Sequence, residues 1–257
     1  MPGDVIPIEA DMRLIRVGTA GWSIPAPYAE RFPGAGSHLE RYARHMATAE
    51  INTSFYRPHR RTTYQRWADS VPDDFRFAVK LPKAISHEAR LIDVAEPLER
   101  CLGEAAGLGD KLGVLLLQLP PSLAFDAAAA GAFLRILRER HDGLVALEPR
   151  HGSWFTPAVD ELLTVFRVAR VAADPAPVPD AAGPGGWPGL VYLRLHGSPR
   201  IYYSAYEPEV LDRLAEKARR HAAAGTPVWI ILDNTAAGAA LGDALAVEAH
   251  LAERTQG

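Results

Sequence analysis

The sequence has little of three features that would assign a protein to a class at once: cysteine, long apolar runs and charge of one sign. Cys101 is the one cysteine among 257 residues, so no disulfide can form within the chain, and a disulfide-stapled secreted domain is excluded. No apolar run approaches the ~18 residues of a membrane-spanning helix, and residues 1–7 lack the basic and then apolar pattern of a secretory signal. We therefore expect a cytoplasmic protein with no membrane partner, in which Cys101 is a small buried side chain.

The charge is nearly balanced, with 28 Lys and Arg residues against 31 Asp and Glu residues and a net charge of −3. This balance gives no general attraction to nucleic acid, which stays open as a partner only through a local basic patch. Any anion-binding site must therefore be local. The 48% of hydrophobic residues is too high for a disordered chain and is enough for one barrel-sized domain or two small ones.

Short β-rich runs alternate with segments of helical period along the chain, which is typical of a parallel sheet covered by helices. Eight runs predict strands near residues 14–18, 49–52, 75–80, 113–118, 144–148, 170–174, 190–195 and 228–233. Eight strands in about 250 residues match a TIM-type (β/α)8 barrel, which we predict as a single α/β domain over residues 1–257. An open doubly wound sheet is the alternative, and the absence of a Gly-x-Gly-x-x-Gly turn and of a P-loop weakens it.

Residues that start helices stand between most of these strands. Ser37 and Thr62 each begin a capping-box pattern, and Asp126 and Thr156 are further candidate caps. The connection from Asp174 to Gly189 differs, because its five prolines and four glycines forbid a regular helix. We expect a loop in place of the sixth helix. A linker between two domains is the alternative, but the strand pattern resumes at once.

Polar residues follow the predicted strands, at the end of a barrel where loops carry the chemistry. The strand-end segments, in chain order, are Gly18–Trp22, Glu50–Tyr56, Lys80–His87, Gln118–Pro121, Glu148–Trp154, Arg194–Gly197 and Asp233–Thr235. Taken together and in this order, they resemble the domain-of-unknown-function 72 (YecE-like) family. The resemblance covers nearly the whole chain and implies a TIM-type barrel, and it implies no reaction, since the family is named for having none assigned. Ser86 replaces the usual threonine of the family, and Gly242-Asp243 stands where many members have an asparagine.

Several bases lie at the predicted strand ends, so one barrel mouth could collect positive charge despite the net charge of −3. We expect Lys80, Arg150 and Arg194 to hold an anionic ligand, because guanidinium and ammonium groups bind phosphate and carboxylate. The alternative is that these bases pair with the neighbouring carboxylates Glu50, Glu148 or Asp233. Further residues predicted to bind or orient the substrate are Asn52, Tyr56, Gln118, Asp233 and Asn234.

Glu148 and His196 are the predicted catalytic acid and base. A carboxylate and an imidazole on different strand ends can face one cavity and exchange protons with a substrate. The alternative for Glu148 is a structural ion pair with Arg194. The sequence requires no cofactor, but a bound divalent metal ion is a further possibility. Glu148, Asp174, His196 and Asp233 end four successive strands, and their oxygen and imidazole ligands suit Mn²⁺, Mg²⁺ or Zn²⁺.

Three hypotheses of function follow from these residues. The first is an enzyme that acts by acid–base chemistry on an anionic, phosphate-bearing or nucleotide-like small molecule, as a hydrolase, isomerase or lyase. The second is a divalent-metal-dependent isomerase or endonuclease-like barrel. The third is a protein without catalytic activity that binds or senses an anion or nucleic acid at the same mouth. Fold alone decides between none of them.

Overall fold

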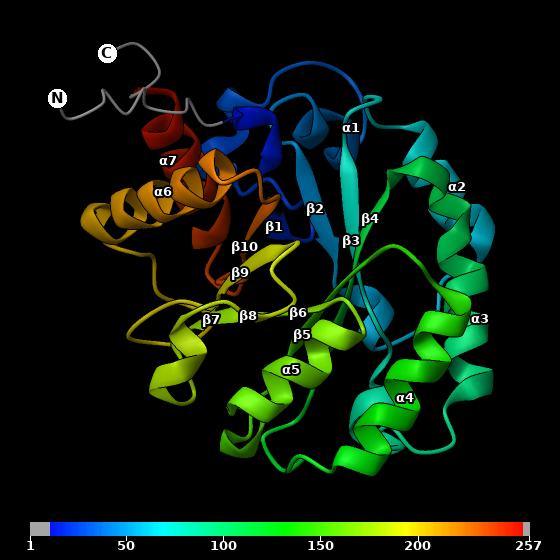
Figure 1. Cartoon of the computed structure of the whole chain (residues 1–257). Coiled ribbons are helices and arrows are strands. Elements are labelled where there is room, and N and C mark those ends of the chain that lie inside the picture. The colour runs from blue at the N-terminus through cyan, green and yellow to red at the C-terminus, as the bar shows by residue number, and fades with distance from the viewer. Residues whose placement is uncertain (1–10, 254–257) are drawn as a thin grey trace, which may run out of the picture.

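The strands pair in parallel around a barrel with helices outside it, which confirms the predicted TIM-type α/β architecture (Figure 1). The computed structural model describes residues 11–253, so the segment 1–7 and the two ends of the predicted domain lie outside the described residues. The strands are β1 (Ile15–Ala20), β2 (Thr48–Ile51), β3 (Arg76–Lys80), β4 (Leu112–Gln118), β5 (Leu144–Glu148), β6 (Val168–Arg170), β7 (Ala172–Asp174), β8 (Gly185–Gly186), β9 (Val191–Leu195) and β10 (Val228–Leu232).

The barrel closes through the segment 168–174, of which we predicted residues 170–174 as one strand. It is split at Val171: β6 pairs in parallel with β5, and β7 pairs in parallel with β9. The remaining neighbours follow in the order β9, β10, β1, β2, β3, β4 and β5. One segment thus joins the two ends of the sheet, because its first half pairs with β5 and its second half pairs with β9.

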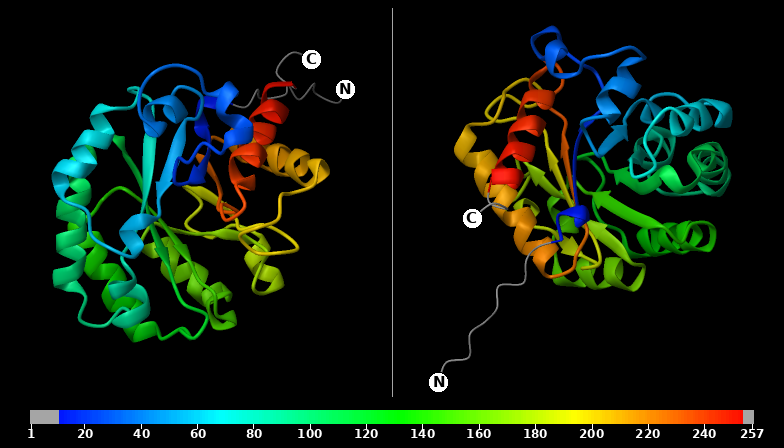
Figure 2. Two further views of the ribbon diagram at one scale, coloured as in Figure 1. Left: turned by 180° about the vertical axis from the view of Figure 1, so that it is seen from behind. Right: turned by 90° about the horizontal axis from the view of Figure 1, so that it is seen from above.

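Seven α-helices accompany the described strands: α1 (His38–Ala43), α2 (Arg61–Asp69), α3 (Ala95–Ala105), α4 (Ala127–Arg140), α5 (Pro157–Val165), α6 (Pro208–Ala223) and α7 (Ala239–Glu253). Helices α6 and α7 lie on one side of the barrel, and α2 to α4 lie on the opposite side (Figure 2). No helix within residues 11–253 is long and apolar enough to cross a membrane.

The helix starts follow local chemistry in most of the predicted places. Ser37 forms the expected capping box with Glu40, and Asp126 accepts a hydrogen bond from the N–H of Ala129 at 2.9 Å. The prediction for Thr62 is wrong, because the extended residue Arg60 already precedes the helix and places Thr62 inside its first turn.

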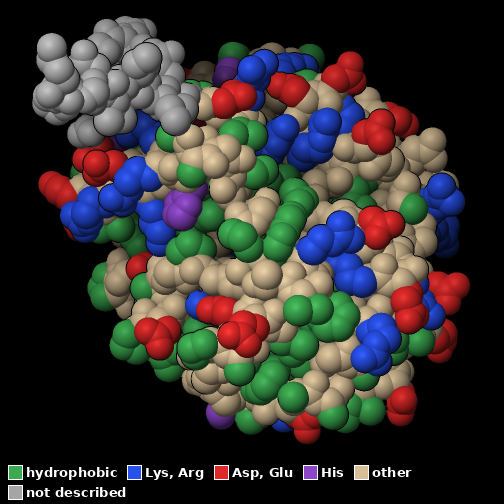
Figure 3. All heavy atoms as spheres, viewed as in Figure 1, with side chains coloured by type: hydrophobic (Ala, Val, Ile, Leu, Met, Phe, Trp, Pro, Cys, Tyr) green, Lys and Arg blue, Asp and Glu red, His purple; other side chains and the backbone are tan. Residues whose placement is uncertain are grey.

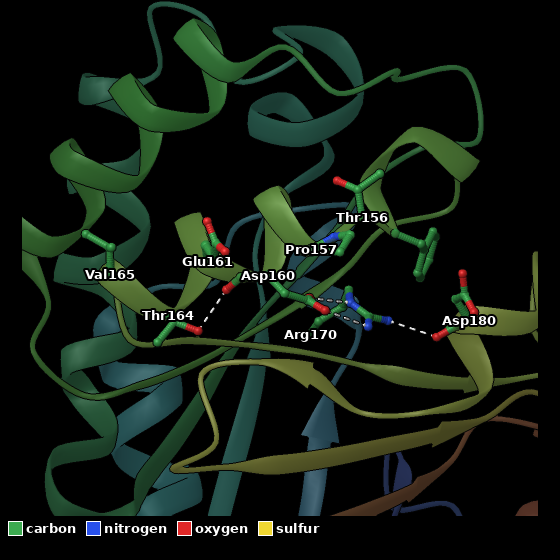
Figure 4. Close-up of a pocket in the computed structure, with 9 residues that line it drawn as sticks. Thr156, Pro157, Asp160, Glu161, Thr164, Val165, Arg170 and Asp180 are labelled. Atoms are coloured by element: carbon green, nitrogen blue, oxygen red, sulfur yellow. Dashed lines mark hydrogen bonds and ion pairs between the residues drawn. The ribbon is translucent and has the colours of Figure 1, made fainter.

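Within residues 11–253, the connection from Asp174 to Gly189 forms no α-helix, as its proline and glycine content predicted. A short 3-10 turn (Pro179–Ala182) and β8 take the place of the sixth helix, and β8 pairs antiparallel with β6. A cavity of about 780 Å³ opens between this segment and α5 (Figure 4). Inside it Asp160 holds Arg170 through two contacts, of 2.8 and 3.2 Å. None of the predicted site residues lines this cavity.

The core has an outer part and an inner part. The larger cluster packs strands against helices and includes Cys101, whose thiol pKa burial raises to about 12, so that it is the inert side chain expected. The smaller cluster fills the barrel interior with the residues Ala78, Val114, Leu116, Ala146, Ala169, Val171, Leu190, Tyr192, Trp229 and Ile231. Alternation along a strand then places every second residue on the same inner face.

Candidate functional site

A polar layer lies above the apolar interior, at the carboxyl ends of the strands. The period of two that puts Ala146, Tyr192 and Ile231 inside the barrel puts Glu148, Arg194 and Asp233 inside as well. Each of these three polar residues is at most 5% exposed. The layer therefore forms because, on each of these strands, the last inward-facing residue is charged and the inward-facing residue before it belongs to the apolar cluster.

Arg194 joins three carboxylates at the centre of this layer. Its guanidinium lies 2.7 Å from Glu50, 3.0 Å from Glu148 and 2.9 Å from Asp233. Tyr192 completes the cluster by donating its hydroxyl to Glu50 at 2.9 Å. The ion pair between Glu148 and Arg194, given above as the alternative, is thus present, and the Arg194 side chain is fully buried.

His196 lies between two carboxylates. Its Nδ1 atom is 3.0 Å from Asp233 Oδ2, and its Nε2 atom is 2.8 Å from Glu148 Oε1. Arg150 approaches the same edge of the ring, with Nη2 at 2.6 Å from Nε2 and 2.5 Å from Glu148 Oε1. The Nε2 atom therefore has an acceptor and a donor within hydrogen-bond distance at the same time.

Glu148 and Asp233 are both held as carboxylates. Burial alone raises the pKa of Glu148, but Arg194, His196 and Arg150 together lower it well below the ordinary value. Burial likewise raises the pKa of Asp233, and Arg194 and the hydrogen bond from His196 outweigh it, so that the pKa is lowered. Two anions thus flank the imidazole, one at each nitrogen.

Lys80 ends β3 beside this network and is 4% exposed. Burial first, and then the positive charge of Arg194, lower the pKa of its ammonium group to about 8 against the opposing effect of the carboxylates. The Nζ atom lies 4.3 Å from the centre of the Phe55 ring. With Lys80, Arg150 and Arg194 against Glu50, Glu148 and Asp233, the formal charges balance when His196 is neutral.

Of the other predicted substrate-binding residues, Gln118 contacts the network directly, and Asn234, Asn52 and Tyr56 have other surroundings. Gln118 joins the network, since its Nε2 atom donates to Glu148 Oε2 at 3.1 Å. Asn234 is buried beneath it and donates to Ser204 O at 2.8 Å and to Asp243 Oδ2 at 2.6 Å. The Oδ1 atom of Asn52 is buried and has no hydrogen-bond partner among residues 11–253. Tyr56 is 70% exposed and packs edge-on against the ring of Phe55, with the ring centres 5.0 Å apart.

Three of the four predicted metal ligands meet in this network, namely Glu148, His196 and Asp233, and Asp174 lies apart from them. Asp174 accepts a hydrogen bond from the Tyr206 hydroxyl at 2.8 Å and contacts none of the other three side chains. Both nitrogens of His196 already face carboxylates. Among residues 11–253, no group of three or more His, Cys, Asp or Glu side chains is arranged to hold a metal ion. The predicted metal site therefore gains no support from this arrangement.

Two tyrosines complete the site: Tyr192, which the sequence reasoning missed, and Tyr202, which the loop after the strand near 190–195 offered as a ligand candidate. Tyr192 lies two residues before Arg194 and four before His196, so the alternation of β9 carried the signal for its inward position. Tyr202 covers the imidazole with its ring centre 5.7 Å from that of His196, at an interplanar angle of 89°. Its backbone φ of 70° belongs to the left-handed region, a conformation that sequence pattern does not reveal for a tyrosine.

The family of the chain follows from comparison with known proteins. A family model described as "Protein of unknown function DUF72" matches residues 16–257. The chain belongs to the DUF72 family. The resemblance found in the strand-end motifs is thereby confirmed.

Curated relatives of the DUF72 chain match over part of their length. "UPF0759 protein YecE" of Escherichia coli (strain K12) is 31% identical over 150 residues, which cover 58% of this chain and 53% of that protein. "UPF0759 protein YunF" of Bacillus subtilis (strain 168) is 26% identical over 164 residues, which cover 61% of this chain and 57% of that protein. The chain thus spans about half the length of these curated relatives.

Solved structures of DUF72 proteins share the fold. The EF0366 protein of Enterococcus faecalis V583 superposes with a TM-score of 0.78 at 24% identity, over 92% of this chain and 95% of that one. The TM1631 protein of Thermotoga maritima MSB8 gives a TM-score of 0.74 at 24% identity, over 93% and 99%. These similarities establish the barrel.

Proposed function

We propose that this DUF72 protein is a cytoplasmic enzyme that acts by acid–base chemistry on an anionic, phosphate-bearing or nucleotide-like small molecule at the barrel mouth. One observation carries the proposal: Nε2 of His196 faces Glu148 at 2.8 Å and Arg150 at 2.6 Å. A protonated Nε2 donates to Glu148, and a deprotonated Nε2 accepts from Arg150. The ring can therefore hold or release a proton at one atom without turning, as a general acid and base must.

Asp233 would keep the imidazole in register during this exchange. It accepts from Nδ1 at 3.0 Å, so the proton that comes and goes is the one on Nε2. Gln118 and Arg194 bind the other oxygen of Glu148 at 3.1 and 3.0 Å and fix that carboxylate. The reacting proton then passes between groups whose positions are set by buried partners.

Arg150 is the group that we assign to the anion. Its side chain is 15% exposed, whereas those of Arg194 and His196 are fully buried. An anion that draws the guanidinium outward removes Nη2 from Nε2 and leaves the imidazole open to the substrate. Lys80 adds positive charge to the same mouth, and Asn52, Asn234 and Tyr56 remain proposed orienting residues. The cytoplasmic assignment is supported by the single cysteine, which leaves the chain without an internal disulfide.

Figure 3 shows how charged side chains are distributed over one face of the molecule. Basic and acidic side chains are interspersed there, and neither sign forms a continuous patch. A local site at the mouth is therefore the arrangement that we favour for a small ligand, in agreement with the nearly balanced net charge.

The test is nitrogen NMR of the His196 ring during titration with inorganic phosphate and adenosine monophosphate. We expect both ring nitrogen signals to shift in the intact protein and to stay unchanged in Arg150→Met. Arg57→Met is the matched control, because it removes the same charge from an exposed arginine outside the network. Unchanged His196 signals with every anion would contradict the proposal.

A binding protein without catalytic activity is the second candidate. The complete pairing of buried Arg194 with three carboxylates favours it, because such a cluster can serve structure alone. Mass spectrometry of molecules that co-purify with the protein identifies a ligand with which the two candidate functions can be compared. If Glu148→Gln and His196→Gln bind that ligand as the intact protein does, and no product forms, the enzyme assignment fails.

A further inference from the structure

Lys80 stands out among the cations of the barrel mouth because it is a lysine. The chain has four lysines among its 28 basic residues, and the others are Lys83, Lys111 and Lys217. Each of those three has a polar partner: Lys83 pairs with Glu88, Lys111 binds the carbonyl of Pro72, and Lys217 binds that of Ala182. Lysine is thus a rare basic residue in this chain, and one of the four lies at the barrel mouth.

The amine of Lys80 is buried but unpaired. In the described part of the chain, no hydrogen bond or ion pair is made by its Nζ atom, which faces the Phe55 ring. His87 packs on the same ring, with centroids 4.9 Å apart, and its Nδ1 atom lies 2.9 Å from Ser86 Oγ. Lys80 therefore has an apolar wall, a neighbouring imidazole and a nearby guanidinium, that of Arg194.

Burial and the positive charge of Arg194 favour the neutral, nucleophilic form of the Lys80 amine, and they outweigh the face of the Phe55 ring and the nearby carboxylates, which favour its charged form. A lysine becomes a nucleophile near neutral pH when it is desolvated or placed beside another cation, and both conditions hold at Lys80, where the pKa is lowered to about 8. A cation meant only to bind an anion gains nothing from this loss of charge. Arginine would keep its charge at the same place.

We propose that Lys80 is a catalytic nucleophile that forms a covalent imine with an aldehyde or ketone carrying an anionic group. The inference rests on the proposed function, because it places the reacting carbonyl in the mouth where Arg150 holds the anion. It adds the substrate class, a carbonyl compound, and the bond that is formed.

The chemistry uses only the amine, the carbonyl and groups already present. The Nζ lone pair attacks the carbonyl carbon, and the pair of the C=O bond moves to the oxygen, which takes the proton lost by nitrogen. The resulting carbinolamine then expels its hydroxyl as water, with a proton supplied by the His196 and Glu148 pair or by His87. The nitrogen lone pair forms the C=N bond, and water later reverses the same steps.

The experiment is reductive trapping with glyoxylate, a carboxylate-bearing aldehyde, and cyanoborohydride, followed by peptide mass spectrometry. We expect Lys80 to be labelled roughly ten times faster than Lys83, Lys111 or Lys217 at pH 7, because more of its amine is neutral. Acetaldehyde is the neutral comparison probe. Lys80→Arg should abolish the fast phase, and Lys217→Arg should leave it intact.

A readout on the intact protein guards against a variant that does not fold. The labelling rate of the Lys80 peptide should rise with pH to a midpoint near its pKa of about 8, whereas an ordinary lysine has its midpoint near 10.5. Labelling spread over all four lysines according to exposure, with no separate midpoint for Lys80, would overturn the proposal.

The same measurements separate this inference from the proposed function. If phosphate shifts the His196 signals but Lys80 is not labelled, the imine alone is wrong. If Lys80 is labelled equally fast by glyoxylate and acetaldehyde, and phosphate leaves His196 unchanged, the imine stands and anion binding at Arg150 fails. In the expected case the preference for glyoxylate disappears in Arg150→Met.

Discussion

The Nε2 atom of His196 lies 2.8 Å from the Oε1 atom of Glu148, although β6 and β7 stand between the strands that carry them. The contact spans 48 positions of sequence. The contact forms because both side chains point into the barrel from the carboxyl ends of their strands. Residues on strands that do not pair with each other therefore meet in the interior.

Removal of the Glu148 charge should destabilise the fold. In Glu148→Gln, Arg194, Arg150 and His196 lose the anion that they share, and breaking such a buried pair costs about 3 kcal/mol. We expect a loss of that size in the free energy of unfolding measured with urea. Glu139→Gln is the control, because its partner Arg140 is a surface residue and exposed pairs contribute ~0.5 kcal/mol. Equal losses in the two variants would show that the network is not coupled.

Lys80→Met should make the protein more stable at neutral pH. The pKa of Lys80 falls from 10.5 in the unfolded chain to about 8 in the fold, so its protonation opposes folding below pH 8. That cost decreases as pH rises from 8 to 10.5. Urea unfolding should therefore show a gain on the order of 2 kcal/mol at pH 7 that shrinks toward zero above about pH 10. A gain that does not depend on pH would mean that packing, and not charge, is responsible.

Anion binding should take up protons near pH 8. A bound anion favours the charged form of Lys80, whose pKa is about 8, so binding raises that pKa and draws protons from the solvent. Calorimetry with phosphate ions in buffers of different ionisation enthalpy measures this uptake. We expect it to be larger at pH 8 than at pH 6, where Lys80 is already protonated. Lys80→Arg should bind without this uptake, since arginine keeps its charge.

Asp243 should be replaceable by asparagine but not by alanine. Its Oδ2 atom accepts hydrogen bonds from Asn234 Nδ2 at 2.6 Å and from the N–H of Tyr206 at 3.2 Å. An amide oxygen can accept both bonds, whereas alanine leaves two buried donors unsatisfied at a cost of about 2 kcal/mol. Thermal unfolding should thus separate Asp243→Ala from Asp243→Asn, and equal melting temperatures would exclude this role. Burial raises the pKa of Asp243, so protonation of this carboxyl favours the fold, and the intact protein should gain stability relative to Asp243→Asn as the pH falls through that pKa.

The positions of the eight predicted strands were accessible because they depend on local patterns, whereas the division of the sixth into β6 and β7 and the extra strand β8 were not predicted. Runs such as Val228–Leu232 and Leu144–Glu148 carry their β-propensity in consecutive residues, and the polar residues after them are visible in the same way. The replaced sixth helix was also predictable, because proline and glycine forbid helix wherever they occur in such numbers.

The pairing of side chains was less accessible to sequence reasoning. Whether Arg194 faces a ligand or three carboxylates depends on the tilt and register of β2, β5 and β10, which no local pattern fixes. The position of Asp174 was misjudged for a related reason: the break of the strand at Val171 and the bond to Tyr206 direct its side chain away from His196. Tyr202 reaches His196 through a loop conformation, and propensities say little about such loops.

The short strand β8 has a consequence for how the molecule meets its neighbours. Because the segment 168–174 serves β5 with one half and β9 with the other, β6 keeps an edge on which a foreign strand could add. Gly185 and Gly186 occupy that edge by pairing with Arg170 and Ala169. A Cβ atom on Gly186 would come within 2.7 Å of the Val168 carbonyl, so only a residue without a side chain can lie there. Within residues 11–253, the two glycines thus occupy the edge of β6 that would otherwise be open to another strand.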